Sequence, residues 1–336
     1  MKNLKKIGLT ALAASLVSTS VFAGEMTVAG SAGINWENYG AGDLGKNDTT
    51  LGSDGTKSFS MGNQLTFSGS GELDNGLTVS LSFVLDQGDD SSAASTTVLA
   101  GAPFDSHSVT VSSDSFGSLT YNGEGGDSAQ NAVGDTAAGN IWDLWDGRQG
   151  ANSKLKESNG GTNFTYTLPS MVDGLAVSAS YQPAGTNDES DTAYSLTYTG
   201  VEGLTVSYGS GSNDSASGSA SNSDTTSIKA SYAIGSFTVA YSDHEHDSST
   251  NTADQDASAF KLSYTVSDAM SVSYAEETIK SGTASDQDAE YTRLSASYTT
   301  GGMTISGNMS EMKNGTYSTA VAGDEDYAGL SVSFAF

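Results

Sequence analysis

The feature that most constrains this chain is a repeated alternation of apolar and small polar residues, broken by short turns rich in Gly and Asp. In the last segment Leu330, Val332 and Phe334 share one strand face with the terminal Phe336, and the residues between them are Ser or Ala. Successive side chains of a β-strand point to opposite faces, so each segment has one apolar and one small polar face. A soluble sandwich carries charge on its outer face, whereas here the charges gather in the connections. A barrel with lipid outside and water inside accounts for this division.

The alternation predicts an all-β fold, a transmembrane antiparallel β-barrel of sixteen strands. We expect the strands around residues 28–36, 65–73, 77–85, 109–111, 119–121, 164–168, 175–181, 194–198, 204–208, 228–234, 237–241, 260–266, 270–274, 294–298, 303–307 and 330–336. An even number places both chain ends on one side of the membrane, with short turns there and long loops on the other side. Strand ends are the least certain part of such a count, so fourteen or eighteen strands stay open.

Tyrosines near the strand ends agree with a barrel in a membrane. Tyr198, Tyr232, Tyr264 and Tyr298 precede tight turns at spacings of 34, 32 and 34 residues, each on the apolar face of its strand. Such rings form girdles at the two membrane interfaces, where the ring contacts lipid and the hydroxyl contacts water. A general preference of Tyr for strands explains how many there are but not where they lie.

The N-terminal segment 1–23 has the pattern of an export signal. Three lysines precede the apolar stretch 7–17, and Val21-Phe22-Ala23 is typical of a cleavage site. The stretch is too short to span a membrane as a helix. We therefore expect a signal peptide at 1–23, an exported barrel domain at 24–336 and a location in the outer membrane.

The mature chain would be strongly acidic, which excludes several classes of function. Removal of the signal leaves 10 basic and 40 acidic residues, a net charge of about −30. Nothing resembles a basic patch, so nucleic acid is excluded as a partner. Cys is absent, no nucleophile has a partnered base and no phosphate-binding loop is recognisable. We expect no enzyme activity and no cofactor beyond loosely bound divalent cations.

One histidine pair offers a weak metal hypothesis. In His244-Glu245-His246-Asp247 the two imidazoles would share a strand face and could bind a transition metal. Such a site normally needs three or four ligands, and the alternative is a solvated loop.

The connection expected at 123–161 is the longest and differs from the other loops. Apolar Ile141, Trp142, Leu144 and Trp145 surround Asp143, a spacing that predicts a turn of helix with one packed face. Two Trp residues favour a loop folded against the protein, and a wide barrel has an interior to be partly filled. We therefore expect this long third loop to fold into the lumen.

Over nearly its whole length the chain resembles the general, non-specific porins of Gram-negative outer membranes, especially the shorter alphaproteobacterial ones. Segment 116–122 looks like that family's entry into the third loop, and Gly125-Gly126-Asp127 looks like its glycine-acid tip. The family usually has a basic residue after the fifth strand, where Asn122 stands here. The resemblance implies a third loop that narrows the pore, a homotrimer, contact with outer-membrane lipid and lipopolysaccharide, and a terminal aromatic residue that aids insertion.

Charged residues predict a pore constriction with opposed walls. The acids of the long loop are Glu124, Asp127, Asp135, Asp143 and Asp146. Lys229, Lys261 and Arg293 recur at spacings of 32 residues with parity opposite to the strand tyrosines, so they point into the barrel as a basic ladder that lines the pore. In the alternative, the loop acids are solvated or pair locally with Arg148, Lys154 and Lys156.

These observations predict passive diffusion of small hydrophilic solutes and ions through a water-filled pore. Because acids dominate, we expect the pore to prefer cations. The alternative is an acidic secreted or surface protein of β-sandwich or β-solenoid repeats, structural or adhesive, without channel activity. That alternative does not explain the strand-end tyrosines or the terminal Phe336.

Overall fold

The computed structural model describes residues 26–40, 57–86, 104–145, 154–155, 161–184, 189–214, 222–250, 253–318 and 323–336. The strands in these ranges are β1 (Met26–Tyr39), β2 (Lys57–Glu72), β3 (Thr78–Asp86), β4 (Ser106–Ser113), β5 (Gly117–Gly126), β6 (Gly161–Thr167), β7 (Leu175–Gln182), β8 (Asp191–Tyr198), β9 (Leu204–Asn213), β10 (Ser223–Ile234), β11 (Phe237–Ser248), β12 (Gln255–Ser267), β13 (Met270–Ser281), β14 (Ala289–Thr300), β15 (Met303–Lys313) and β16 (Glu325–Ala335). Two short 3-10 helices, η1 (Asn131–Val133) and η2 (Ile141–Trp145), follow β5. The expected signal at 1–23 lies outside the described residues and stays a prediction.

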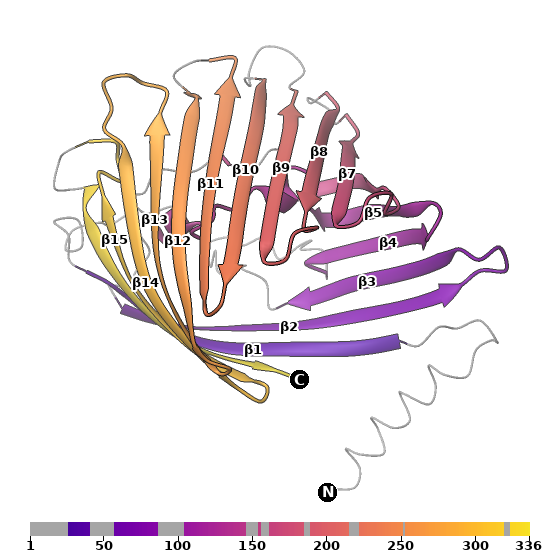
Figure 1. The fold of residues 1–336 in the computed structure, drawn as a ribbon, viewed down its shortest axis with the longest axis horizontal. Helices are drawn as coiled ribbons and strands as arrows, with labels where there is room; N and C mark the ends of the chain where they lie inside the picture. Colours follow the sequence, from indigo (N-terminus) through magenta and orange to yellow (C-terminus); the bar gives the residue numbers. More distant parts are fainter. Residues whose placement is uncertain are drawn as a thin grey trace, which may run out of the picture.

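The sixteen strands form one closed antiparallel barrel (Figure 1). Each strand pairs with its neighbours in the sequence, and β1 pairs with β16 to close the ring, with Ile34 opposite Val332 and Trp36 opposite Leu330. The prediction of a sixteen-stranded barrel is therefore confirmed. The closed ring excludes the sandwich and solenoid alternatives, because those folds do not close one sheet on itself.

None of the helices in the described ranges is long and apolar enough to cross a membrane.

The strands carry an exposed apolar face, as the alternation predicts, and β12 is a clear example. On β12, Phe260, Leu262 and Tyr264 are 37–39% exposed, whereas Ala257 and Ala259 on the opposite face are at most 3% exposed. Residues two apart on a strand share a face, so the apolar set and the small set lie on opposite sides of the sheet. An exposed apolar face around a closed sheet is what a barrel presents to lipid.

The tight turns contain glycines where the backbone requires them. Gly203, between β8 and β9, has a φ of +76°, in the left-handed region that other residues rarely adopt. Tyr198 ends β8 just before this turn and is 37% exposed on the apolar face. The tyrosines Tyr232, Tyr264 and Tyr298, at equivalent places on β10, β12 and β14, are 39–46% exposed. Their positions are those of an interfacial girdle.

The last residue of the chain completes the barrel seam. The Phe336 backbone N donates to the Gly30 carbonyl oxygen at 2.9 Å, and the Gly30 N donates to the Phe336 carbonyl oxygen at 2.8 Å. A Cβ atom on Gly30 would overlap the Phe336 ring, so a larger residue at this position of β1 would displace the ring.

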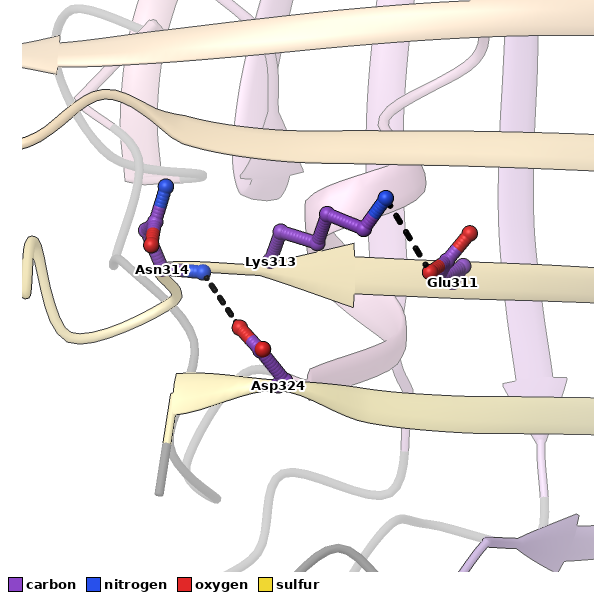
Figure 2. A network of polar contacts seen from close by, with 4 residues as sticks. All are labelled: Glu311, Lys313, Asn314 and Asp324. Atoms are coloured by element: carbon purple, nitrogen blue, oxygen red, sulfur yellow. Dashed lines mark hydrogen bonds and ion pairs between the residues drawn. The ribbon is translucent and has the colours of Figure 1, made fainter. Parts of the chain in front are cut away.

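Two polar contacts lie near the end of the β15–β16 hairpin, one between its two sides and one within β15 (Figure 2). The backbone N of Asn314 donates to the Asp324 carboxylate at 3.0 Å, and Lys313 Nζ lies 3.3 Å from a carboxylate oxygen of Glu311. The Lys313 and Glu311 side chains are 54% and 48% exposed, so water and salt screen their attraction. Of these two contacts only the hydrogen bond to Asp324 joins the two sides of the hairpin, because Glu311 and Lys313 both lie on β15.

Candidate functional site

The face opposite the exposed apolar residues carries polar side chains that a loop covers. Ser180 of β7, Ser227 of β10, Ser242 of β11 and Glu277 of β13 are each 8% exposed or less. Burial of such groups on an open sheet face requires a covering segment. That segment belongs to the connection between β5 and β6, of which residues 127–145 and 154–155 are described.

Three serines of the wall bind this connection. The Ala129 backbone N donates to Ser180 Oγ at 2.9 Å, and the Ala137 backbone N donates to Ser242 Oγ at 2.8 Å. The Gln130 amide donates from Nε2 to Ser227 Oγ and to the Leu155 carbonyl oxygen, both at 2.9 Å. The connection is thus tied to β7, β10 and β11, and Gln130 joins its two described parts.

Glu277 of β13 accepts three hydrogen bonds from the same connection. Thr136 Oγ1 donates to Glu277 Oε2 at 2.6 Å, and the Ile141 backbone N donates to the same oxygen at 3.2 Å. The Trp142 backbone N donates to Glu277 Oε1 at 3.1 Å. Bonds to a carboxylate are stronger than bonds between neutral groups, so Glu277 is a strong anchor for this part of the loop.

An apolar cluster holds the next turn. Ile141 and Trp145 of η2 are fully buried, and Trp145 packs on Tyr291 of β14 with ring centroids 5.7 Å apart and on Tyr327 of β16 at 6.3 Å. Asp143, between them in sequence, is exposed. The prediction of a helical turn with one packed face is confirmed, with the correction that the turn is a 3-10 helix.

The predicted acids of the loop differ in their surroundings. Asp135 and Asp143 have exposed side chains, and Asp135 accepts a hydrogen bond from Asn140 Nδ2 at 2.8 Å. Asp127 is exposed just after β5, and Glu124 pairs with His107 across a bulge in β5. Asp146 lies outside the described residues.

Two of the three predicted bases touch the loop itself. Lys229 Nζ donates to the backbone oxygen of Asp135 at 3.0 Å, and Arg293 Nη1 lies 3.4 Å from the backbone oxygen of Gly139. Lys261 is partly exposed between them on β12. The side chain of Lys154, a candidate local partner of the acids, donates instead to the Ala253 backbone oxygen at 2.8 Å.

The histidine pair lies in a strand, so the alternative that these residues form a solvated loop was wrong. His244 and His246 are on β11, 1% and 8% exposed, with Nδ1 atoms 2.8 Å from Ser227 Oγ and 2.9 Å from Thr225 Oγ1. They are buried because they share the covered face of the barrel wall. Among the described residues no three His, Cys, Asp or Glu side chains are grouped to hold a metal. Loose binding of divalent cations stays a prediction.

Glu277, Tyr291 and Tyr327 contact the loop but were not predicted from the sequence. Each lies on the strand face opposite the exposed apolar residues, as Lys229, Lys261 and Arg293 do. The alternation of faces that placed those bases on the inner face therefore places these residues there too. The missing information was which inner positions the loop covers, because that depends on contacts between distant parts of the chain.

Comparison with known proteins agrees with this architecture. By its fold alone, the protein is a transmembrane β-barrel. The sequence profile of Gram-negative porins matches residues 8–336, and the chain therefore belongs to the Gram-negative porin family.

Similar solved structures include a refined porin, with 19% sequence identity and a TM-score of 0.63. A protein from a study of asymmetric conductivity in engineered proteins has 15% identity and a TM-score of 0.63. A double mutant of the Rh. blastica porin has 14% identity and a TM-score of 0.62. Each comparison covers 93% of this chain and 100% of the other, and at these identities it supports the fold alone. No curated protein matches the chain.

Proposed function

We propose that this outer-membrane porin passes small hydrophilic solutes and ions by diffusion through a pore that the β5–β6 connection narrows, and that it prefers cations. Membership of the Gram-negative porin family supports the channel itself. The narrowing and the preference are proposals that rest on the contacts of the loop.

The observation that carries the narrowing is the set of wall residues that the connection touches. They come from β7, β10, β11 and β13 and, through Tyr39 Oη and the Leu144 carbonyl oxygen at 3.0 Å, from β1. All share the face opposite the exposed apolar residues, and in a barrel with lipid outside that face lines the lumen. A sixteen-stranded barrel leaves an aqueous channel, so a segment that lies along its inner wall from β7 through β16 to β1 occupies part of the cross-section.

The charges near the loop support cation preference. Asp135 and Asp143 are exposed residues of the loop, whereas Lys229 and Arg293 are only partly exposed and direct donors at its backbone oxygens; the Arg293 charge also interacts with Asp143. The whole chain carries 40 acidic and 13 basic residues. Fixed charge in a narrow aqueous passage between low-dielectric walls enriches ions of opposite sign.

Planar-bilayer recording of the purified barrel tests both proposals. We expect stepwise conductance and, under a KCl gradient, a reversal potential of the sign that K⁺ preference produces. A folded barrel without steps contradicts the open pore, and a reversal potential of the opposite sign shows that the basic residues set the field.

We further propose that residues 1–23 are removed on export and that three copies assemble. The N-terminal pattern supports the first proposal, and the resemblance to general porins supports the second. N-terminal sequencing of the envelope protein should begin at Gly24. Mass measurement in mild detergent should give three times the mass of the heat-denatured chain, and a monomer there contradicts the trimer.

A further inference from the structure

Glu277 is an unusual residue for the wall of a water-filled barrel, because its carboxyl group is buried. The residue is 1% exposed, and it lies on the inner face of β13 between Ala275, at 2%, and Ile279, at 0%. A carboxyl group is rarely buried to this extent unless its oxygens are satisfied. The three hydrogen bonds that its oxygens accept from Thr136, Ile141 and Trp142 come from one stretch of the loop, residues 136–142.

The backbone N–H donors of this stretch lack an acceptor within their own helix. The Ile141 and Trp142 backbone N–H groups lie at the start of η2, where no preceding helical carbonyl is available to them. Glu277 supplies two oxygens to these groups and to the Thr136 hydroxyl. Buried N–H groups left without an acceptor are costly, so this part of the loop depends on the carboxylate for its position.

A second side chain of the barrel wall, Arg293, contacts the same stretch of the loop. Arg293 Nη1 lies 3.4 Å from the Gly139 backbone oxygen, between the residues that Glu277 binds. The positive charge of Arg293 also interacts with the Glu277 carboxyl group. The two side chains come from adjacent strands, β13 and β14, and together bind donors and an acceptor of one loop segment.

We propose that Glu277 is the positioning residue of the pore loop: its carboxylate, supported by Arg293, holds residues 136–142 against β13 and thereby sets how far the loop reaches into the pore. The part that concerns pore size rests on the proposed narrowing by this loop. The part that concerns loop position does not.

Glu277→Gln is the direct test, because it keeps the size of the side chain while one acceptor oxygen becomes an NH₂ group that faces loop donors. Thr136→Val removes the hydroxyl from the loop side without changing the barrel wall. Thr136→Ser keeps the hydroxyl and should behave as the wild type. Glu276→Gln is the matched control, since it changes the same charge on the adjacent residue of β13, which is exposed and accepts a hydrogen bond from Tyr274 Oη on the other face.

Loop position can be measured without any current. The chain has no Cys, so Ala138→Cys introduces a single thiol within the loop, at a position that is 2% exposed while the loop is docked on the wall. We expect a charged thiol reagent to modify this site about tenfold faster or more when Glu277→Gln or Thr136→Val is added, because a hydrogen bond to a charged group is lost. Thr136→Ser and Glu276→Gln should leave the rate unchanged.

Single-channel recording of the same variants then reports the pore. We expect larger conductance and added current fluctuation in Glu277→Gln and Thr136→Val. An unchanged modification rate in both variants overturns the proposal, and Thr136→Val decides alone if the Glu277 variant does not fold. A faster modification rate with wild-type conductance leaves Glu277 as the loop's positioning residue and contradicts instead the proposed narrowing of the pore.

Discussion

The charged residues around the β5–β6 connection include two bases of the inner wall and two acids of the loop itself. Lys229 and Arg293 direct donors at backbone oxygens of the β5–β6 connection, so both bases help to hold the loop. Asp135 and Asp143 have exposed side chains on that loop. The two acids are therefore more exposed than the two bases, which are only partly exposed, and exposed charge in a narrow passage enriches ions of opposite sign.

We expect Asp135→Asn combined with Asp143→Asn to weaken the cation preference of the pore. The change removes two exposed carboxylates from the loop that we propose narrows the pore, whereas salt screens charges that lie more than roughly 8–10 Å away. The shift in reversal potential under a KCl gradient measures the effect. The control neutralises Asp43 and Asp48 of the first loop, outside the described residues, and should change selectivity less; equal shifts would show that the mouth controls selectivity.

The β5–β6 connection is the element on which the proposed function depends, and apolar packing contributes to its position beside the hydrogen bonds. Trp145 is fully buried against Tyr291 and Tyr327, so η2 is fastened to β14 and β16 while the earlier residues of the connection are fastened to β7, β10, β11 and β13. These contacts lie in series along the connection. Loss of one should release the part of the loop nearest to it.

We expect Trp145→Ala to loosen the connection while the barrel stays folded. Truncation of a buried Trp costs about 3–5 kcal/mol, which here falls on the docking of η2 and not on the strand ladders. Trypsin, which can cut after Lys154 or Lys156, should therefore cleave the folded variant faster than the wild type. Trp36→Ala on the outer face of β1 is the matched control, and equal protection of all three proteins contradicts a docking role for Trp145.

At the scale of the whole molecule, the alternation of faces separates lipid from water around the ring. Leu262 is 38% exposed on the outer face near the middle of β12, and its neighbour Ser263 has the parity of Lys261 on the inner face. The same new charge should therefore have opposite consequences at two adjacent positions.

We expect Leu262→Lys to lower the free energy of unfolding by about 2–4 kcal/mol if the residue lies near the bilayer midplane, because a charge facing lipid is costly there. Ser263→Lys should change it little, since its side chain reaches the aqueous lumen. Urea unfolding of the barrel in lipid vesicles measures both. Similar losses for the two variants would contradict the assignment of the two faces.

Much of the fold could be predicted from local patterns because barrel strands obey a period of two. The alternation in segments such as 260–266 and 330–336 indicated both the strands and their lipid-facing side, and the same parity placed Lys229, Lys261 and Arg293 on the inner face. The helical spacing of Ile141 and Trp145 likewise predicted which side of that turn would pack. His244 and His246 were misassigned because β11 extends further toward the loop than its apolar residues alone indicate.

The sequence by itself determined the sixteen strands, their two faces and the segment that departs from the pattern, because each of these follows from residues close together in the chain. Only the tertiary structure decided that Glu277 binds Thr136, Ile141 and Trp142, and that Lys229 and Arg293 contact the loop backbone. Those contacts join residues 94–154 positions apart. Parity states which way a side chain points, but closure of the barrel is what brings a particular loop atom within hydrogen-bonding distance of it.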